Sequence, residues 1–465
     1  MVGAEQLHSR EDTIAAISTP AGEGGIGIIR ISGGKALSLA QNIFHPKYPQ
    51  KDFDSHRLYL GEIRDPADGD IVDECLMTFM KSPNSFTRED VVELHCHGGT
   101  VVLQRTMELL MRNAIRQAEP GEFTKRAFLN GRIDLSQAEA IIDVIRAKTE
   151  RGLRLAQVQL KGGLKDELAL MRGRLIHALA ILEAYIDFPE EELDPNALAG
   201  MDKDINSSIS FIDKLLSTYE EGRVLREGIH VVIAGRPNVG KSSLLNALLM
   251  EKRAIVTSIP GTTRDTIEEV INLKGIPINL IDTAGIRETE DIVEKEGIKK
   301  ARDKLNEADL ILYMMDERGL NADDFKVIES VTGRKSLFII NKIDIISDER
   351  ANEIKSSLPG DDALSISLKA GKGLEELKDA IFNSVMKHKA DRLPSVIISR
   401  KRHKVSLEFA RKSLERSING INKNLPLELI AIDIKEALNN IAEVAGETTP
   451  DDVLDKIFSD FCIGK

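Results

Sequence analysis

One octapeptide in this chain has the residue types and the spacing of a phosphate-binding loop. Residues 235–242 read GRPNVGKS, which fits the pattern G-x-x-x-x-G-K-[ST]. Glycines at both ends let the backbone curl around an anion, so that successive N–H groups point at a β-phosphate. Lys241 is expected to reach the β- and γ-phosphates, and Ser242 a Mg²⁺ ion. The apolar run before the loop and residues 243–250 after it predict the strand and the helix that such a loop connects.

A second set of residues predicts that the bound nucleotide is GTP. The segment NKID at 341–344 follows another apolar run. The carboxylate of Asp344 can accept hydrogen bonds from the guanine N1–H and exocyclic amine, a pair of donors that adenine does not offer. The segment SLK at 367–369 is expected to cover the base, with backbone N–H groups near the guanine O6. The expected base-binding residues are Asn341, Lys342, Asp344, Ser367, Leu368 and Lys369.

Two further segments are expected to sense the γ-phosphate. The segment GTTRD at 261–265 is interpreted as switch I, with Thr263 as a second hydroxyl ligand of Mg²⁺. The segment DTAG at 282–285 closes a predicted strand and places a carboxylate near the magnesium and a glycine N–H near the γ-phosphate. The nucleotide-binding residues expected from the loop and the switches are Asn238, Val239, Gly240, Lys241, Ser242, Ser243, Thr257, Ser258, Ile259, Pro260, Gly261, Thr262, Thr263, Asp282, Thr283, Ala284 and Gly285.

The residue after DTAG is Ile286, whereas Ras-like enzymes carry there a glutamine that orients the attacking water. Hydrolysis therefore needs another device. Asn238 resembles the asparagine of K⁺-dependent GTPases, whose side-chain oxygen helps to hold K⁺ beside the phosphates. The alternative is that Asn238 only braces the turn, because asparagine is common in turns. The K⁺ site implied by the resemblance comprises Asn238, Thr257, Ile259 and Thr262.

Length and composition set limits on the rest of the chain. The 465 residues suggest about three domains of ~100 to 200 residues each. A net charge of −12 argues against binding nucleic acid by bulk electrostatics, so an RNA partner would need a local patch or a helper protein. Three widely spaced cysteines, Cys75, Cys96 and Cys462, form no disulfide framework. With no leader-like or membrane-spanning run, we expect a cytoplasmic protein with no membrane partner.

The pattern of apolar residues predicts a multidomain α/β protein. Short β-like segments and glycine turns fill the N-terminal part and indicate a separate α+β domain. Helical spacing follows over 135–182 and returns over 396–414 and 427–444. The economical arrangement is one helical domain interrupted by an inserted Ras-like P-loop GTPase domain, since domain termini are commonly close together. The expected boundaries are 1–124, 125–221, 222–387 and 388–465. The expected N-terminal strands are 14–17, 26–31, 58–63, 70–80 and 90–97.

Segments outside the GTPase block resemble one family closely, the tRNA wobble-uridine modification GTPases MnmE, also called TrmE. These segments are GGIGIIRISG at 24–33, SFTRED at 85–90, ELHCHGG at 93–99, PGEF at 120–123, AFLNG at 127–131 and the terminal FCIGK at 461–465. The GTPase block alone would not separate this family from the ribosome-assembly GTPase Der. Der carries two such blocks and this chain one, so a Der-like ribosome-assembly GTPase is the alternative reading.

The resemblance implies a homodimer formed through an N-terminal domain similar to folate-binding one-carbon enzymes. It assigns Arg30, Glu89, Arg132 and Lys465 to a pocket for 5-formyl- or 5,10-methylene-tetrahydrofolate. Glu89 could accept hydrogen bonds from the pterin, while arginines favour the carboxylates of the glutamate tail. Where MnmE proteins often have glycine in the segment SFTGED, this chain has Arg88, which could perturb the loop beside that pocket.

The resemblance also implies the catalytic residues and the partners. Cys462 matches the cysteine that the family needs for tRNA modification, and Glu294 matches a glutamate proposed to act on the hydrolytic water. Without the family, a free cysteine is more often a small buried hydrophobe, and a lone glutamate in a charged helix is usually solvated. With an MnmG-like flavoprotein, forming a heterotetramer, the dimer would add an aminomethyl or carboxymethylaminomethyl group to C5 of the wobble uridine of tRNA.

Overall fold

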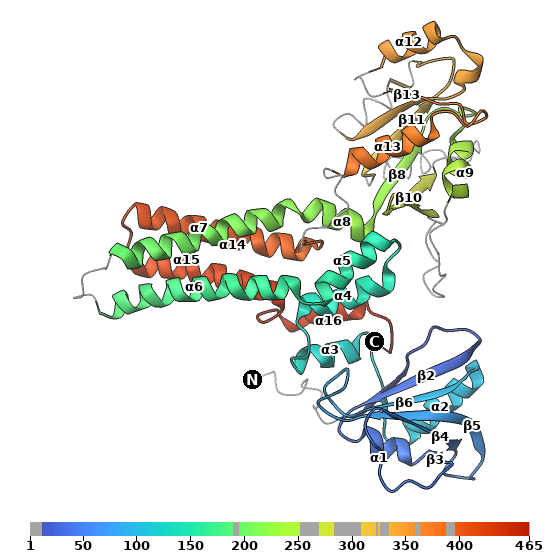
Figure 1. Ribbon diagram of the computed structural model, residues 1–465, viewed down its shortest axis with the longest axis vertical. Helices are drawn as coiled ribbons and strands as arrows, with labels where there is room; N and C mark the ends of the chain where they lie inside the picture. The colour runs from blue at the N-terminus through green and yellow to red at the C-terminus, as the bar shows by residue number, and fades with distance from the viewer. Residues whose placement is uncertain are drawn as a thin grey trace, which may run out of the picture. The chain divides into compact units, whose positions relative to one another are not determined.

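The computed structural model describes residues 12–188, 195–251, 269–282, 308–321, 324–325, 334–358, 363–386 and 396–464. Within these ranges the chain forms two compact units, one from 12–142 with 442–464 and the other from the described part of 143–441 (Figure 1). None of the helices formed by the described residues combines the length and the hydropathy needed to cross a bilayer.

The first unit is built on a seven-stranded mixed sheet with the order β3-β4-β5-β6-β2-β1-β7. Alternation of buried and exposed side chains along β5 puts Cys75, Met77 and Phe79 in the core. Helix α2 turns Leu103, Met107 and Leu110 toward the same core, at the spacing of one helical face. The strands are β1 (Ile14–Ile17), β2 (Gly24–Ser32), β3 (Phe44–Pro46), β4 (Arg57–Arg64), β5 (Ile71–Met80), β6 (Val91–Gly98) and β7 (Arg116–Gln117), with helices α1 (Ala36–Gln41) and α2 (Thr100–Arg112).

The end of the chain returns to this first unit. Helix α16 (Asp451–Ser459) packs against α3 (Glu122–Leu129) and the start of α4 (Leu135–Arg146) through Leu454, Phe458 and Phe461. Beyond it, Gly464 lies against β1: its φ is +91°, and a Cβ there would come within 2.5 Å of the Ile17 carbonyl oxygen. Only glycine fits such a backbone contact without strain. The last residues are therefore held beside β1 and β2.

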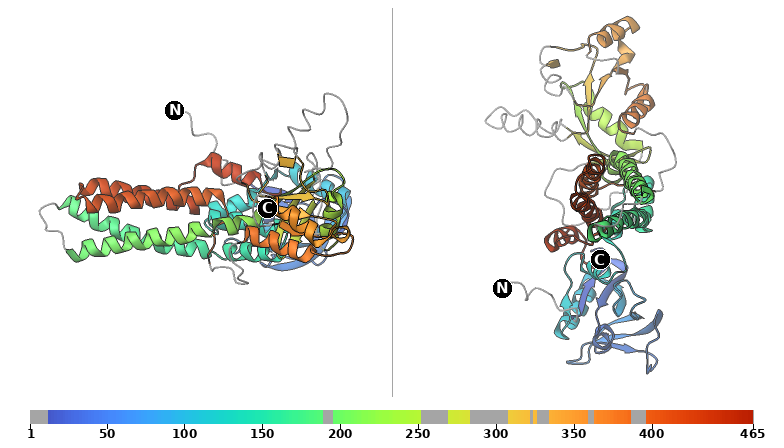
Figure 2. Two further views of the ribbon diagram at one scale, coloured as in Figure 1. Left: turned by 90° about the horizontal axis from the view of Figure 1, so that it is seen from above. Right: turned by 90° about the vertical axis from the view of Figure 1, so that its left-hand side faces the viewer.

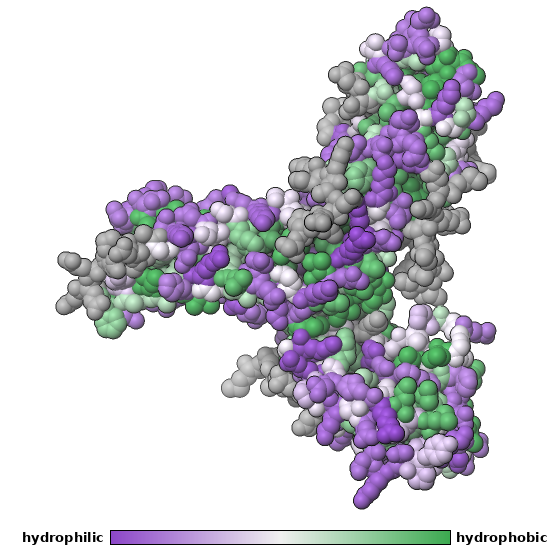
Figure 3. Space-filling view, viewed as in Figure 1, coloured by the Kyte–Doolittle hydropathy of each residue, from purple (hydrophilic) through white to green (hydrophobic). Residues whose placement is uncertain are grey.

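The second unit contains a bundle of long helices. Helix α7 (Pro195–Ser217) packs against α6 (Gly163–Asp187) and α14 (Lys401–Asn422), and ion pairs join α15 (Leu427–Ala445) to α14 and α6 (Figures 1 and 2). Helices from before and after the GTPase block thus share one bundle. Hydrophilic residues dominate the outer face of this bundle seen in Figure 3, as expected where apolar faces turn inward.

The GTPase block of the second unit forms a six-stranded sheet with the order β13-β12-β11-β8-β10-β9. All neighbouring strands are parallel except β10 and β9. The chain order reverses at β8, and in such sheets ligands bind at the carboxyl ends of the strands beside the reversal. The strands are β8 (Ile229–Ala234), β9 (Glu269–Leu273), β10 (Ile276–Asp282), β11 (Leu310–Met315), β12 (Ser336–Ile340) and β13 (Ala363–Ser365), with helices α9 (Lys241–Glu251), α12 (Asp348–Ser356) and α13 (Leu374–Val385).

The entry to this block and the exit from it lie side by side. Helix α8 (Tyr219–Glu227) leads into β8, and the exit segment 396–400 is hydrogen-bonded to its start, with Ile398 N donating to Thr218 Oγ1 at 3.2 Å. Gln159 of α5 (Glu150–Leu160) donates to the Ile397 carbonyl. An insertion into the helical domain requires this proximity. The fold is therefore the predicted one, an α+β domain and a helical domain interrupted by a Ras-like GTPase.

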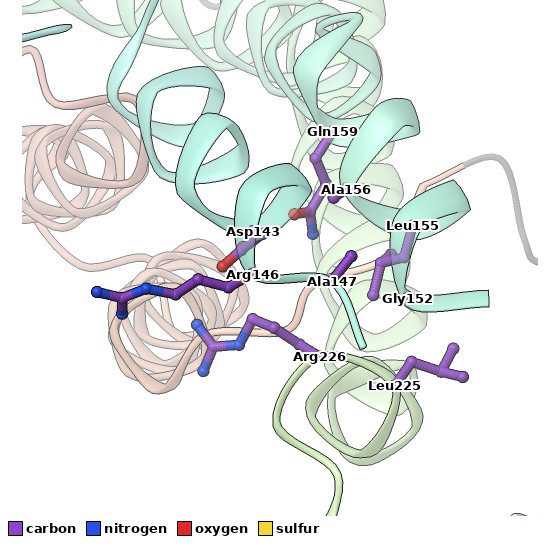
Figure 4. Close-up of a pocket in the computed structure, with 9 residues that line it drawn as sticks. All are labelled: Asp143, Arg146, Ala147, Gly152, Leu155, Ala156, Gln159, Leu225 and Arg226. Carbon is purple, nitrogen blue, oxygen red and sulfur yellow. The ribbon is translucent and has the colours of Figure 1, made fainter. Parts of the chain in front are cut away.

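A small cavity of about 30 Å³ lies at this junction (Figure 4). It has room for one or two water molecules and none for a nucleotide or a folate. Asp143 accepts a hydrogen bond from Arg400 Nη2 at 2.7 Å, which fixes the exit segment to α4. The residues that line the cavity are Asp143, Arg146, Ala147, Gly152, Leu155, Ala156, Gln159, Leu225 and Arg226.

The five predicted N-terminal strands are confirmed, each to within two residues. The start of one predicted helix is wrong: the helix expected from Val396 begins at Lys401. Residues 396–400 stay outside the helix because their backbone bonds to other elements: Ile398 N donates to Thr218 Oγ1, and the Ile397 carbonyl oxygen accepts from Gln159 Nε2.

Candidate functional site

The phosphate loop connects β8 to α9, as the sequence predicts. Gly240 has a φ of +110°, and a Cβ there would lie 2.3 Å from Asn341 Nδ2. The loop can therefore approach the NKID segment only because this residue is glycine. The Lys241 ammonium donates to the carbonyl oxygens of Gly235 and Arg236, both at 2.8 Å, and so lies across the loop. Ser242 and Ser243 are exposed in the first turn of α9.

Asn341 ties three loops together at the carboxyl edge of the sheet. Its side chain is only 4% exposed and donates through Nδ2 to the Val239 carbonyl oxygen at 2.8 Å. Its Oδ1 accepts from the backbone N–H of Leu368 at 3.3 Å. The phosphate loop, the NKID segment and the SLK segment are thus joined by one amide whose donor and acceptor are both used.

Asp344 is exposed next to this amide. Its Oδ1 accepts from Ser367 Oγ at 2.6 Å, and this hydrogen bond lowers the pKa of the Asp344 carboxyl below its usual value. The carboxylate is therefore ionised at neutral pH and acts only as an acceptor, as guanine recognition requires. Lys369 is exposed on the same turn. The structure places these residues together, as predicted.

Asn238 is exposed at the tip of the phosphate loop, with a left-handed φ of +66°. Asparagine tolerates that backbone better than most residues. The turn geometry is thus by itself a sufficient reason for asparagine here, so a role in K⁺ binding stays a prediction.

Several expected residues lie outside the described part of the chain. Asp282 ends β10 at the carboxyl edge of the sheet. The expected residues outside the described ranges are Thr257, Ser258, Ile259, Pro260, Gly261, Thr262, Thr263, Thr283, Ala284, Gly285, Glu294 and Lys465.

The sequence analysis missed a group of charged residues behind the phosphate loop. Asp316 follows β11 directly and is completely buried. It accepts hydrogen bonds from Arg318 Nη2 at 2.7 Å and Lys342 Nζ at 3.1 Å, and Arg236 lies 3.8 Å away. A carboxylate immediately after a six-residue apolar run is the signal that could have revealed it, because such a position falls at the ligand-binding edge of the sheet.

In the first unit, Arg30 links the sheet to the end of the chain. Its Nε donates to Glu93 Oε1 at 2.8 Å, and its Nη1 donates to the Gly464 carbonyl oxygen at 3.2 Å. Ser18 Oγ donates to the same carbonyl. Hydrogen bonding by His95 and the charge of Arg30 outweigh burial and lower the pKa of Glu93. Cys462 is exposed two residues before Gly464, whereas Cys75 and Cys96 are buried.

Glu89 lies in a neighbouring network that sequence reasoning only partly identified. It accepts from Ser32 Oγ at 2.7 Å and from Arg126 Nη1 at 3.1 Å. Arg126 in turn pairs with Asp12. Arg126 and Asp12 were missed, because a charged residue on a short helix or near the N-terminus carries no sequence signal of partial burial.

Phe86 lies close to both predicted arginines. The guanidinium carbon of Arg132 is 4.8 Å from the centre of the Phe86 ring, and that of Arg30 is 5.6 Å from it. Arg132 Nη1 also donates to the Phe86 carbonyl oxygen at 2.9 Å. Burial, and then the positive charge of Arg88, lower the pKa of Arg132. The structure thus brings Arg30 and Arg132 to the Phe86 ring, with Glu89 in the neighbouring network of Ser32 and Arg126; these residues are called the polar cluster of the first unit.

A mostly parallel sheet with a phosphate loop and an NKID loop joined at its carboxyl edge defines a P-loop GTPase. A family model described as the MnmE helical domain matches residues 135–462, and one described as the GTP-binding protein TrmE N-terminus matches residues 13–132. The tRNA modification GTPase MnmE of Geobacter sulfurreducens is 50% identical over 457 residues, covering 98% of this chain and 99% of that protein. The protein of that name from Carboxydothermus hydrogenoformans is 50% identical over 466 residues, covering 98% and 100%. The chain belongs to the MnmE family of tRNA modification GTPases.

The backbone at Arg88 generates a prediction about stability. Arg88 has a left-handed φ of +60°, and its Nη1 donates to the Asn130 carbonyl oxygen at 2.9 Å. We expect Arg88→Gly to be more stable than Arg88→Ala by about 1 kcal/mol, because both lose the guanidinium contact and only alanine keeps the left-handed penalty. Denaturant unfolding of the two variants measures the difference. An alanine variant at least as stable as the glycine variant would contradict the expectation.

Proposed function

We propose that this chain is a K⁺-stimulated GTPase that acts in tRNA modification with a flavoprotein partner. In this proposal the two proteins add a carboxymethylaminomethyl or aminomethyl group to C5 of the wobble uridine of certain tRNAs. The observation that carries the proposal is the 50% identity to tRNA modification GTPases over 98% of the chain. Sequence identity at that level supports the same activity, because the match covers both the GTPase block and the domains on either side of it.

The geometry of the second unit supports GTP as the nucleotide. Asp344 is ionised, exposed and acceptor-only, and Asn341 holds the neighbouring loops in place. Ser242, with Thr263, would hold Mg²⁺, and Lys241 would contact the phosphates. Asn238, with Thr257, Ile259 and Thr262, would hold K⁺, and Glu294 would act on the hydrolytic water.

The polar cluster of the first unit suits a tetrahydrofolate. Glu89 offers a carboxylate for pterin donors, and Arg30 and Arg132 offer guanidinium groups close to the Phe86 ring. Guanidinium groups bind carboxylates in a bidentate manner, which matches the glutamate tail. Bound folate would supply the one-carbon unit. Lys465 follows Gly464, whose carbonyl Arg30 holds, so the proposal places the terminal lysine beside the pocket.

The partners follow from charge and family. Because this chain has a net charge of −12, we expect a partner similar to MnmG to provide most of the affinity for RNA. In this proposal the same partner carries the flavin. We propose that two copies of this chain form a homodimer and join that partner in a heterotetramer. We also propose that each copy has the domain segments 1–124, 125–221, 222–387 and 388–465. The family assignment favours this function over the ribosome-assembly alternative, which no observation in the structure supports.

The first test concerns the cation. We expect K⁺ to raise the rate of GTP hydrolysis over Na⁺ by roughly tenfold or more, since a cation there replaces the charge of an arginine finger. Asn238→Gly should abolish this stimulation, and glycine is the matched replacement because it keeps the left-handed φ without strain. Rates in K⁺ and Na⁺ measure the effect. Equal rates for the native chain would remove the cation from the mechanism.

The second test separates hydrolysis from modification. Cys462→Ser should abolish tRNA modification by the chain with its flavoprotein partner, because a hydroxyl cannot supply a thiolate. GTP hydrolysis should stay near normal, since the exposed Cys462 lies in the first unit and the phosphate loop in the second. Reconstituted modification of tRNA and GTP turnover are both measured. Normal modification by the serine variant would show that the thiol has no catalytic part.

A further inference from the structure

A buried carboxylate connects the two halves of the nucleotide site. Asp316, at the end of β11, has no exposed surface. Its Oδ2 accepts from Lys342 Nζ at 3.1 Å, and Lys342 belongs to the NKID segment. Its Oδ1 lies 3.8 Å from Nη2 of Arg236, which belongs to the phosphate loop. One carboxylate thus faces a cation from the phosphate-binding side and a cation from the base-binding side.

The Arg236 side chain binds residues that follow β11. Its Nε pairs with Asp324 at 3.3 Å, and its Nη2 donates to the Gly319 carbonyl oxygen. Asp324 is only 4% exposed and accepts from Tyr313 Oη at 2.7 Å. The side chain that anchors the first half of the phosphate loop is therefore fixed in a buried polar network.

Lys342 is held equally firmly on the other side. Its φ is +65°, a left-handed conformation that needs support from its surroundings. The half-buried Glu317 lies 3.7 Å from its ammonium, but Asp316 is closer and more deeply buried. Burial would raise the pKa of Asp316, yet hydrogen bonds from Arg318 and Lys342 outweigh it and lower the value to about 2. The charge is thus permanent at physiological pH.

We propose that Asp316 is a positioning residue that couples the phosphate loop to the guanine-binding loop. The inference rests on the proposed binding of GTP and deepens it. Removing one of these cations leaves the buried carboxylate less well compensated, because only Arg318 and the other cation remain, and these remaining partners then reorient. A change in the position of the phosphate loop therefore alters the position of the base-binding loop, and a change in the base-binding loop alters the phosphate loop. Asn341 makes a separate, neutral tether between the same loops, so Asp316 adds an electrostatic connection through side chains.

Two affinity ratios test the coupling. The ratio of GDP to GMP affinity reports on the phosphate loop, and the ratio of GDP to IDP affinity reports on recognition of the guanine amine by the base loop. Both ratios are independent of the fraction of folded protein, so a loss of stability alone does not change them. We expect Asp316→Asn to lower both ratios by about tenfold, the effect of losing one charge-assisted hydrogen bond. Fluorescent-nucleotide competition on the full chain measures them.

The matched control is Glu317→Gln, which removes the adjacent carboxylate and should leave both ratios within twofold of the native chain. Arg236→Met keeps an apolar stem and provides the second variant if Asp316→Asn does not fold. It should lower the GDP to IDP ratio at least threefold, although Arg236 lies outside the base loop. The proposal is wrong if Asp316→Asn leaves either ratio unchanged, or if Arg236→Met affects only the GDP to GMP ratio. Failure of the native chain to bind GDP would instead overturn the proposed function.

Discussion

The nucleotide site depends on one hydrogen bond, donated by the buried amide of Asn341 to the carbonyl oxygen of Val239. An unpaired amide at this depth would cost about 1–3 kcal/mol, so the two loops are held in contact. Gly240 permits the approach because any side chain there would displace the amide. The carboxyl edge of the sheet then presents a phosphate-binding loop and a base-binding loop at a fixed separation. Asp316 adds a charged connection behind them.

In the first unit, hydrogen bonds to one carbonyl oxygen likewise hold two distant segments of the chain together. The carbonyl oxygen of Gly464 accepts from Arg30 and Ser18, residues more than 430 positions earlier in the chain. The end of the chain thereby completes a polar cluster that β1, β2 and the Phe86 loop begin. A catalytic thiol two residues before such an anchor would have a defined place beside the cluster, whereas a free terminus would not. The proposed chemistry of Cys462 needs that anchoring.

Sequence alone predicted the parts of the fold that local patterns determine. GRPNVGKS, NKID and the alternating N-terminal strands were read correctly, because phosphate loops and half-buried strands have strong local signatures. The start of the helix at Lys401 was not, since Val396, Ile397 and Ile398 are apolar and suit either state, and the hydrogen bonds of this segment to Thr218 and Gln159 cannot be seen in the sequence. The sequence does not show why glycine would suit position 88. The backbone does, because Arg88 has a left-handed φ, which glycine adopts without strain. Asp316, Arg126 and Asp12 were missed because each has partners distant in sequence, and the sequence does not show that a charged residue is buried.

A GTPase that serves tRNA modification leaves its mark on the tRNA itself. Nucleosides from the tRNA of cells that lack this chain should be compared by mass spectrometry with those of cells that carry it. We expect 5-substituted wobble uridines to disappear without the chain and to return when it is restored. Unchanged tRNA, in cells that have no redundant enzyme, would show that the chain does not act in this modification.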